Sequence, residues 1–238
     1  MLFSGDLATR QLQAEIMDDP SLDKERHRAA LQGLERINWW SGSARILWSP
    51  LQALARQVGP GPLRVLDVAS GAGDVPIRLW HKARRAGIDL RIEGCDRSPD
   101  AVRFADQRAR KRQADVRFFV LDVLADAFPA GYDVVTSSLF LHHLADDQAT
   151  ELLKRMAGAA SRLLLVNDLV RNQTGYVLAY VGTRLLSASD VVHTDGPRSV
   201  EGAFTVAEAH WLAERAGLVG ATVERRWPCR YLLTWRRT

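Results

Sequence analysis

The sequence predicts an α/β fold built on a mostly parallel seven-stranded sheet, with a helical N-terminal segment and an insertion after the fifth strand. Three observations predict this fold. Leu63 to Leu79 reads as a short apolar strand, a glycine-containing turn and a helix. Strand and helix patterns then alternate along the chain. The 238 residues, 47% of them hydrophobic, are enough for one sizeable core.

The turn between that strand and helix has the features of a ligand cradle. Gly71 and Gly73 let the backbone approach a ligand closely, because no Cβ stands in the way. A dinucleotide fingerprint, G-x-G-x-x-G, would need a third glycine where Pro76 stands. Asp74 would also repel a pyrophosphate at the start of the helix. Together with Asp67, it favours a ligand that carries positive charge.

These residues carry a family resemblance. Asp67, Gly71 and Gly73 match D-x-G-x-G-x-G, the first motif of the class I S-adenosylmethionine-dependent methyltransferases, which the stretch resembles; Ala69 replaces the first glycine. The cofactor of that family has a cationic sulfonium and ammonium and no phosphate, in agreement with the charge argument. The resemblance implies a Rossmann-like fold and S-adenosylmethionine as cofactor.

The first 60 residues are expected to form an all-helical lid. Helical spacing runs over 6–17 and 22–37, and Ser49-Pro50 reads as a cap followed by proline at the first position of a helix to about Val58. The stretch 38–48 loosely resembles the segment before the first motif in quinone-biosynthesis C-methyltransferases. Gly59-Pro60-Gly61-Pro62 is the linker. The catalytic domain is expected over 61–238.

Within this domain we expect five strand–helix units and then a closing hairpin. The predicted parallel strands are 63–68, 90–95, 116–121, 132–137 and 162–166, with helices at 75–86, 99–112 and 146–159. Thr205 and Glu208 form a capping box for a further helix that stops at Gly217. Strands at 219–227 and 230–235, joined through Pro228, must be antiparallel, so the last strand is inserted antiparallel in the sheet.

An insertion, 170–203, separates the fifth strand from that last helix. It is expected to hold an apolar helix, 174–186, and then a polar loop, 192–198. The loop, with its sequence His193-x-Asp195-Gly-Pro-Arg198, is a candidate to order over a substrate; the alternative is a solvent-exposed turn.

The family resemblance implies the cofactor-binding residues. Asp67, at the end of the first strand, would orient the amino-acid end of the cofactor beside Ala69, Gly71 and Gly73. Asp96 ends the second strand and can accept both ribose hydroxyls with its two oxygens; the alternative is a helix cap, for which Ser98 competes.

Residues after the next strands would complete that site. Arg97 would flank the adenine. Asp122 ends the third strand and would accept the adenine amino group, with the backbone N–H of Val123 beside it. Ser138 ends the fourth strand near the expected position of the methyl group.

The candidate catalytic residues are His142, His143 and His193. The first two lie just past the fourth strand, where one can act as a general base or orient a hydroxyl; the alternative is local packing. His193 is the rival base. Phe140, Tyr176, Tyr180 and Arg198 are the expected substrate-binding residues.

The charge, the cysteines and the apolar runs of the sequence exclude several kinds of partner. The net charge is +4 and the sequence pI about 9.4, but the basic residues are nearly all arginines that scatter along the chain. We therefore expect a solvated surface and no nucleic-acid partner.

Cys95 and Cys229 have no metal-site spacing, and no metal or disulfide is expected. The absence of an 18-residue apolar run predicts no membrane span, and we expect a cytoplasmic enzyme. A homodimer is one option for its assembly.

The expected activity is methyl transfer from S-adenosylmethionine to an oxygen, or an activated carbon, of a small aromatic molecule of phenolic, polyketide-like or quinone-like type. The chain resembles small methyltransferases of bacterial natural-product and quinone pathways. Three alternatives stay open: an RNA or protein methyltransferase, a nicotinamide-binding oxidoreductase, and a non-catalytic nucleotide-binding module.

Overall fold

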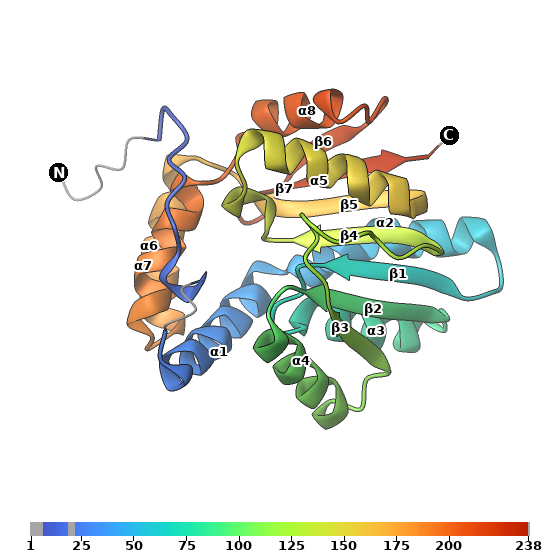
Figure 1. Cartoon of the computed structure of the whole chain (residues 1–238), viewed down its shortest axis with the longest axis horizontal. Helices are drawn as coiled ribbons and strands as arrows, with labels where there is room; N and C mark the ends of the chain where they lie inside the picture. Colours follow the sequence, from blue (N-terminus) through green and yellow to red (C-terminus); the bar gives the residue numbers. More distant parts are fainter. Residues whose placement is uncertain (1–6, 19–21, 238) are drawn as a thin grey trace.

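A seven-stranded sheet forms the centre of the protein, as the computed structural model shows (Figure 1). The strand order is β3-β2-β1-β4-β5-β7-β6. All neighbouring pairs from β3 to β5 are parallel, and β7 pairs antiparallel with both β5 and β6. The predicted fold class and the inserted antiparallel last strand are therefore confirmed.

The structure describes residues 7–18 and 22–237, without the side chains of residues 24, 27, 34, 35 and 38–41. The loosely matching stretch that begins at Asn38 therefore lies partly outside the described side chains. The elements in chain order are η1 Ile16–Asp18, α1 Lys24–Ser41, α2 Ser43–Val58, β1 Leu63–Val68, α3 Asp74–Ala86, β2 Leu90–Asp96, α4 Pro99–Lys111, β3 Val116–Val120, β4 Tyr132–Ser138, η2 Leu141–His143, α5 Asp146–Ala159, β5 Ala160–Leu169, α6 Gln173–Leu186, α7 Asp190–Glu201, α8 Val206–Arg215, β6 Thr222–Arg226 and β7 Arg230–Arg236.

Each face of the sheet has its own apolar core. On one face α5 and α8 pack against inward residues such as Leu66, Val135 and Leu164. On the other face α2, α3 and α4 pack against the alternate residues of the same strands, such as Val65 and Leu163. This alternation along each strand buries β1, β4 and β5 on both faces, as expected for central strands of a parallel sheet.

Helix α2 begins earlier than predicted. It starts at Ser43, after Gly42 in the left-handed conformation, and Pro50 lies inside it. The expected cap at Ser49-Pro50 is thus wrong. The proline lacks one helical N–H, but buried Leu47, Leu51 and Leu54 hold the helix on the sheet on both sides of it.

Three helices, α1, α6 and α7, contact one another beside the carboxyl ends of the parallel strands, toward which the arrowheads of β1 and β4 point (Figure 1). This group is the lid that we propose. The expected lid of residues 1–60 is divided in the structure, because α1 contacts α6 and α7 whereas α2 belongs to the sheet layers. The boundary at residue 60 stays a prediction.

The N-terminal segment is not the helix expected over 6–17. Residue 6 lies outside the described residues, residues 7–15 have no helix, and only the short 3-10 turn η1 follows. Tertiary contacts explain the difference: the backbone N–H of Gln11 donates to the Glu201 carbonyl, and those of Ile16 and Met17 donate to the Asp195 carboxylate. The segment therefore lies along α7, as Figure 1 shows.

The prediction of a polar loop at 192–198 is also wrong, because these residues lie within α7. Val191, Val192 and Val200 of this helix are buried. Gly196 allows α6 and α7 to approach closely, since a Cβ there would lie 2.4 Å from Cγ2 of Thr183. Burial of these side chains and the close contact with α6 outweigh the low helix propensity of the Gly-Pro pair.

The connection from β3 to β4 departs from the expected strand–helix repeat. Residues 121–131 contain turns and no helix, and buried Val123 within them packs against the core on the α5 side.

Cys95 and Cys229 are both free. Among the described residues, no helix combines the length and the apolar character that crossing a membrane requires.

Candidate functional site

The turn after β1 combines an open position with a tightly packed one. Ala69, Gly71 and Gly73 all have positive φ, of 54°, 51° and 71°. A Cβ on Gly71 would meet no atom within 4 Å, so the space beside it is open to a ligand, whereas a Cβ on Gly73 would lie 2.6 Å from Cζ of Phe118. Gly71 therefore faces the cradle and Gly73 serves packing. Ala69 takes the left-handed conformation that glycine adopts freely.

Asp67, near the end of β1, is hydrogen-bonded both to this turn and to β4. Its Oδ1 accepts from Oγ1 of Thr136 (2.7 Å) and its Oδ2 from Oγ of Ser70 (3.0 Å). Burial raises the pKa of Asp67 to about 7, against the effect of these two hydrogen bonds, and the charges of Asp74 and Asp96 add to the rise. A cation bound nearby would favour the ionised form.

Three carboxylates, those of Asp67, Asp74 and Asp96, thus surround the turn. The negative charge of these carboxylates and the open space beside Gly71 fit a cationic cofactor such as S-adenosylmethionine and disfavour a phosphate.

Gly94 of β2 is a site residue that the sequence reasoning missed. A Cβ there would lie 2.5 Å from Oγ of Ser70 and 2.7 Å from Cδ1 of Phe118. The missing side chain leaves room for Ser70, which bonds to Asp67. A glycine within an otherwise apolar strand pattern signals such a close approach.

Asp96 ties the end of β2 to the turn. Its Oδ2 accepts from the N–H of Gly71 (2.8 Å) and its Oδ1 from the N–H of Ser98 (2.9 Å). Ser98 supplies the side-chain cap of α4. A carboxylate oxygen has two lone pairs and can accept from more than one donor. The geometry therefore leaves the ribose role of Asp96 as a prediction and removes the capping alternative.

The other expected cofactor residues lie at the same sheet edge. Oδ1 of Asp122 accepts from the N–H of Leu124 (2.9 Å), Val123 is buried and Arg97 is exposed. Ser138 accepts from Nδ2 of Asn167 (2.7 Å), whose own Oδ1 is buried without a hydrogen-bond partner. Their cofactor contacts remain predictions.

His142, in η2, is held by a buried carboxylate. Its Nδ1 lies 2.6 Å from Oδ1 of Asp168, and its backbone N–H donates to Oδ2 of the same residue (3.2 Å). Burial alone would lower the pKa of His142, but Asp168 and then Glu15 outweigh it and raise that pKa to about 10. Both His142 and Asp168 are almost completely buried.

Glu15 completes the cluster and was not expected from the sequence. Its Oε1 lies 3.7 Å from Nε2 of His142 and 3.9 Å from Nδ1 of His143, distances of ion pairs rather than hydrogen bonds. The two imidazole rings lie 4.2 Å apart, centroid to centroid. Burial would raise the pKa of Glu15, but the two histidines and Ser199 lower it. No local motif marks Glu15, because it reaches the site from the N-terminal segment.

Arg10 fixes that segment beside η2. Its guanidinium donates to the carbonyls of Gly202 (2.6 Å), His142 (3.1 Å) and Leu144 (2.6 Å), and forms an ion pair with Asp146. These bonds explain how Glu15 is positioned over His142.

The structure brings some of the predicted substrate and catalytic residues together and separates others. The Phe140 ring centroid lies 6.1 Å from that of His143. Tyr176 and Tyr180 lie on α6, where the guanidinium of Arg184 stacks 3.5 Å from the centroid of the Tyr180 ring. Their substrate contacts stay predictions.

His193 and Arg198 have other partners. Nε2 of His193 lies 2.8 Å from the carbonyl oxygen of Ser187, and Nη1 of Arg198 donates to the carbonyl of Ala14 (3.4 Å). The geometry favours a structural role for His193 at the α6–α7 connection, and Arg198 lies next to the segment that carries Glu15.

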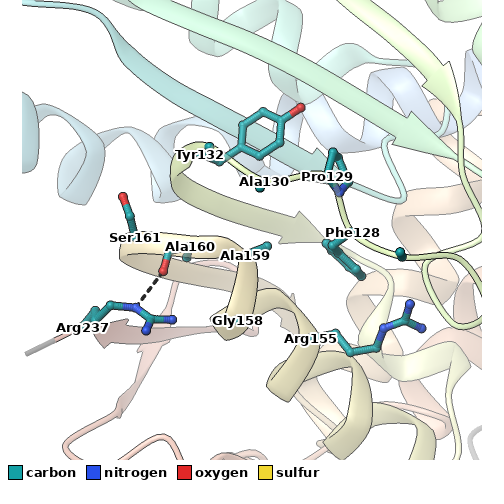
Figure 2. A pocket seen from close by; sticks show the side chains of 12 residues that line it. Phe128, Pro129, Ala130, Tyr132, Arg155, Gly158, Ala159, Ala160, Ser161 and Arg237 are labelled. Carbon is teal, nitrogen blue, oxygen red and sulfur yellow. Dashed lines mark hydrogen bonds between the residues drawn. The ribbon is translucent and has the colours of Figure 1, made fainter.

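A separate hollow of about 560 Å³ lies at the opposite edge of the sheet. Figure 2 shows Tyr132 and Ala160, which are at the amino ends of β4 and β5, on its wall together with Phe128, Arg155 and Arg237. Because the glycine turn and the histidines lie at the carboxyl edge, this hollow is not part of the candidate site.

Comparison with known proteins agrees with this geometry. Residues 65–161 match a family model described as a methyltransferase domain. The chain is 35% identical over 107 residues to a demethylmenaquinone methyltransferase of Thermus thermophilus, covering 44% of this chain and 47% of that protein. It is 34% identical over 116 residues to the same enzyme of Deinococcus radiodurans, covering 48% and 46%. The chain thus matches about half the length of these curated relatives.

A solved structure extends the similarity to the whole fold. Magnesium protoporphyrin IX methyltransferase from Synechocystis PCC 6803, with bound SAH, aligns with a TM-score of 0.58 and 17% identity over 92% of this chain and 90% of that one.

Proposed function

The chain belongs to the class I S-adenosylmethionine-dependent methyltransferases by its domain match and its fold, and we propose from this premise that it methylates a small aromatic acceptor. The acceptor atom is an oxygen or an activated carbon of a phenolic, polyketide-like or quinone-like molecule. We also propose that the protein acts in the cytoplasm, in quinone or natural-product biosynthesis.

One observation carries this proposal. The open turn at Gly71, flanked by carboxylates, follows β1, and the His142–His143 pair follows the neighbouring parallel strand β4 at the same sheet edge. Glu15 joins the histidines there from the N-terminal segment. A donor site and an acceptor site on one edge are what a group transfer needs. The names of the relatives, demethylmenaquinone methyltransferases, support a quinone-like acceptor.

When bound, S-adenosylmethionine supplies an electrophilic methyl group. The residues around the turn would hold it: Asp67 and Asp74 through charge, Asp96 at the ribose and Asp122 at the adenine. On the acceptor side, Asp168 fixes the His142 ring so that Nε2 faces Glu15. We propose that Nε2 of His142 and the ring of His143 orient the acceptor oxygen, with Phe140 and the α6 tyrosines as apolar walls that exclude water.

A turnover assay tests this function. The purified chain is incubated with S-adenosylmethionine and, in parallel, with demethylated quinols, simple phenols, bulk RNA and a protein extract, and methylated products are identified by mass spectrometry. We expect product from the quinols or phenols only. Turnover on RNA or protein, with none on the small molecules, would contradict the proposed acceptor class.

A further inference from the structure

Three side-chain atoms of the kinds that bind metal ions lie close together beside η2. Oε1 of Glu15, Nε2 of His142 and Nδ1 of His143 all lie within 4.8 Å of one another. Ligands bonded at ~2.05 Å in a tetrahedral site lie roughly 3.3 Å apart. The observed 3.7 Å and 3.9 Å from Glu15 to the two histidines are close to this spacing. The two ring nitrogens lie within 4.8 Å of each other, and side-chain rotation would bring them together around an ion.

The contacts of these ligands are those found in metal sites. Asp168 accepts at Nδ1 of His142, a bond that fixes the ring and leaves Nε2 as the coordinating atom. The Ser199 hydroxyl donates to Oε1 of Glu15. A carboxylate behind a ligating histidine orients the ring and strengthens the ligand.

The charges of the cluster also favour a divalent cation. Glu15 and Asp168 are two largely buried carboxylates facing two imidazoles. A divalent ion held between Glu15 and the two rings would be attracted by both carboxylates. Of the cations nearby, Arg10 is engaged with Asp146 and three backbone carbonyls, and buried Arg230 interacts electrostatically with Asp168.

We propose that Glu15, His142 and His143 bind a divalent transition-metal cation of the Zn²⁺ or Fe²⁺ class. Two imidazoles and one carboxylate suit these metals, whereas Mg²⁺ and Ca²⁺ prefer oxygen ligands. Three protein ligands leave at least one coordination position for water or an acceptor oxygen. With an ion bound, Nε2 of His142 would act on the acceptor oxygen of the proposed function through the ion rather than directly. The sequence predicted no metal, because Glu15 and the histidine pair belong to segments far apart in the chain.

Spectroscopic titration tests the site directly. The full chain, freed of metal with a chelator, is titrated with Co²⁺, and the visible absorption of bound Co²⁺ is recorded. We expect one equivalent to bind with the intense bands of a four- or five-coordinate site, and Zn²⁺ to displace it. His143→Ala and Glu15→Gln should each weaken Co²⁺ binding by about 100-fold, and Asp168→Asn by about 10–100-fold.

A matched control and a folding measurement complete the test. His210→Ala removes an exposed histidine that pairs with Glu214 and should leave Co²⁺ binding unchanged. Thermal melts establish that each variant is folded. Co²⁺ binding that His143→Ala leaves intact, or no stoichiometric binding to the parent chain, would overturn the proposal. Calorimetry with S-adenosylmethionine on the same samples separates that outcome from failure of the proposed methyltransferase function.

Discussion

The carboxylate of Asp168 bonds to His142 twice, through Nδ1 of the ring at 2.6 Å and through the backbone N–H at 3.2 Å. The first bond fixes the ring and the second fixes the turn of η2. Asp168 lies near the end of β5, which pairs with β4 directly before η2. The acceptor side that we propose is therefore built into the sheet edge rather than carried on a free loop.

Replacing His142 should separate turnover from cofactor binding. His142→Asn keeps a nitrogen donor near the position of Nδ1 for Asp168 but removes Nε2. We expect methyl transfer to fall by about 100-fold or more, with the dissociation constant of S-adenosylmethionine unchanged by calorimetry. His210→Ala is the control, with unchanged turnover. Weaker cofactor binding with full turnover at saturation would make His142 a structural residue of the cofactor site.

Asp96→Ala should weaken S-adenosylmethionine binding by about 1–3 kcal/mol, because the ribose hydroxyls and the N–H of Gly71 lose their acceptor. Asp100→Ala, an exposed carboxylate in the first turn of α4, is the matched control and should bind normally. Calorimetric titration of both variants measures the difference. Equal affinity in the two would remove Asp96 from the ribose contact.

The ionisation of Asp67 should make cofactor affinity depend on pH. With its pKa raised to about 7, Asp67 becomes an anion only as pH rises, and a cationic ligand then binds more tightly. We expect the affinity for S-adenosylmethionine to rise from about pH 5.5 to about pH 7.5, by at most ~10-fold per pH unit. Asp67→Asn should flatten this profile. The same slope in both proteins would show that another group titrates.

The same carboxyl group affects stability in the opposite direction. The folded protein keeps a proton on Asp67 that the unfolded chain releases near its ordinary pKa of about 4. The contribution of Asp67 to the free energy of unfolding is therefore fully present below about pH 4 and falls as pH rises to about 7. Denaturant titrations of the cofactor-free parent and of Asp67→Asn across this range should show the parent losing stability relative to the variant as pH rises. A constant difference between the two would contradict the raised pKa.

Gly94→Ala should destabilise the protein by about 1–3 kcal/mol, because the new Cβ would collide with Ser70 and Phe118. Gly158→Ala lies inside α5, where a new Cβ would meet no atom within 4 Å, and should instead be neutral or stabilising by up to ~1 kcal/mol. Denaturant unfolding measures both. If Gly94→Ala is as stable as the parent, Ser70 does not need the space that the glycine leaves.

Much of the fold was predictable because its signals are local. The strand–turn–helix at 63–79, the capping box at Thr205 and the terminal hairpin depend on residues close in sequence, and all appear in the structure. The parallel sheet then places the ends of β1, β2 and β4 on one edge, which is why Asp67, Asp96 and His142 lie on the same side.

The elements that were wrong depend on distant partners. Residues 7–15 have helical spacing but bond instead to α7 and η2. The Gly-Pro pair at 196–197 reads as a loop, but Gly196 fits against Thr183 of α6. Glu15 reaches the histidines through the same long-range contacts, so local patterns could not assign it to the site.

Calorimetric titration of the full chain with S-adenosylmethionine and, separately, with NAD tests the central claim most directly. The open turn at Gly71 and its three carboxylates predict saturable binding of S-adenosylmethionine at one equivalent and no heat from NAD. Binding of NAD with no binding of S-adenosylmethionine would contradict the account of the turn, and with it the assignment of the whole site.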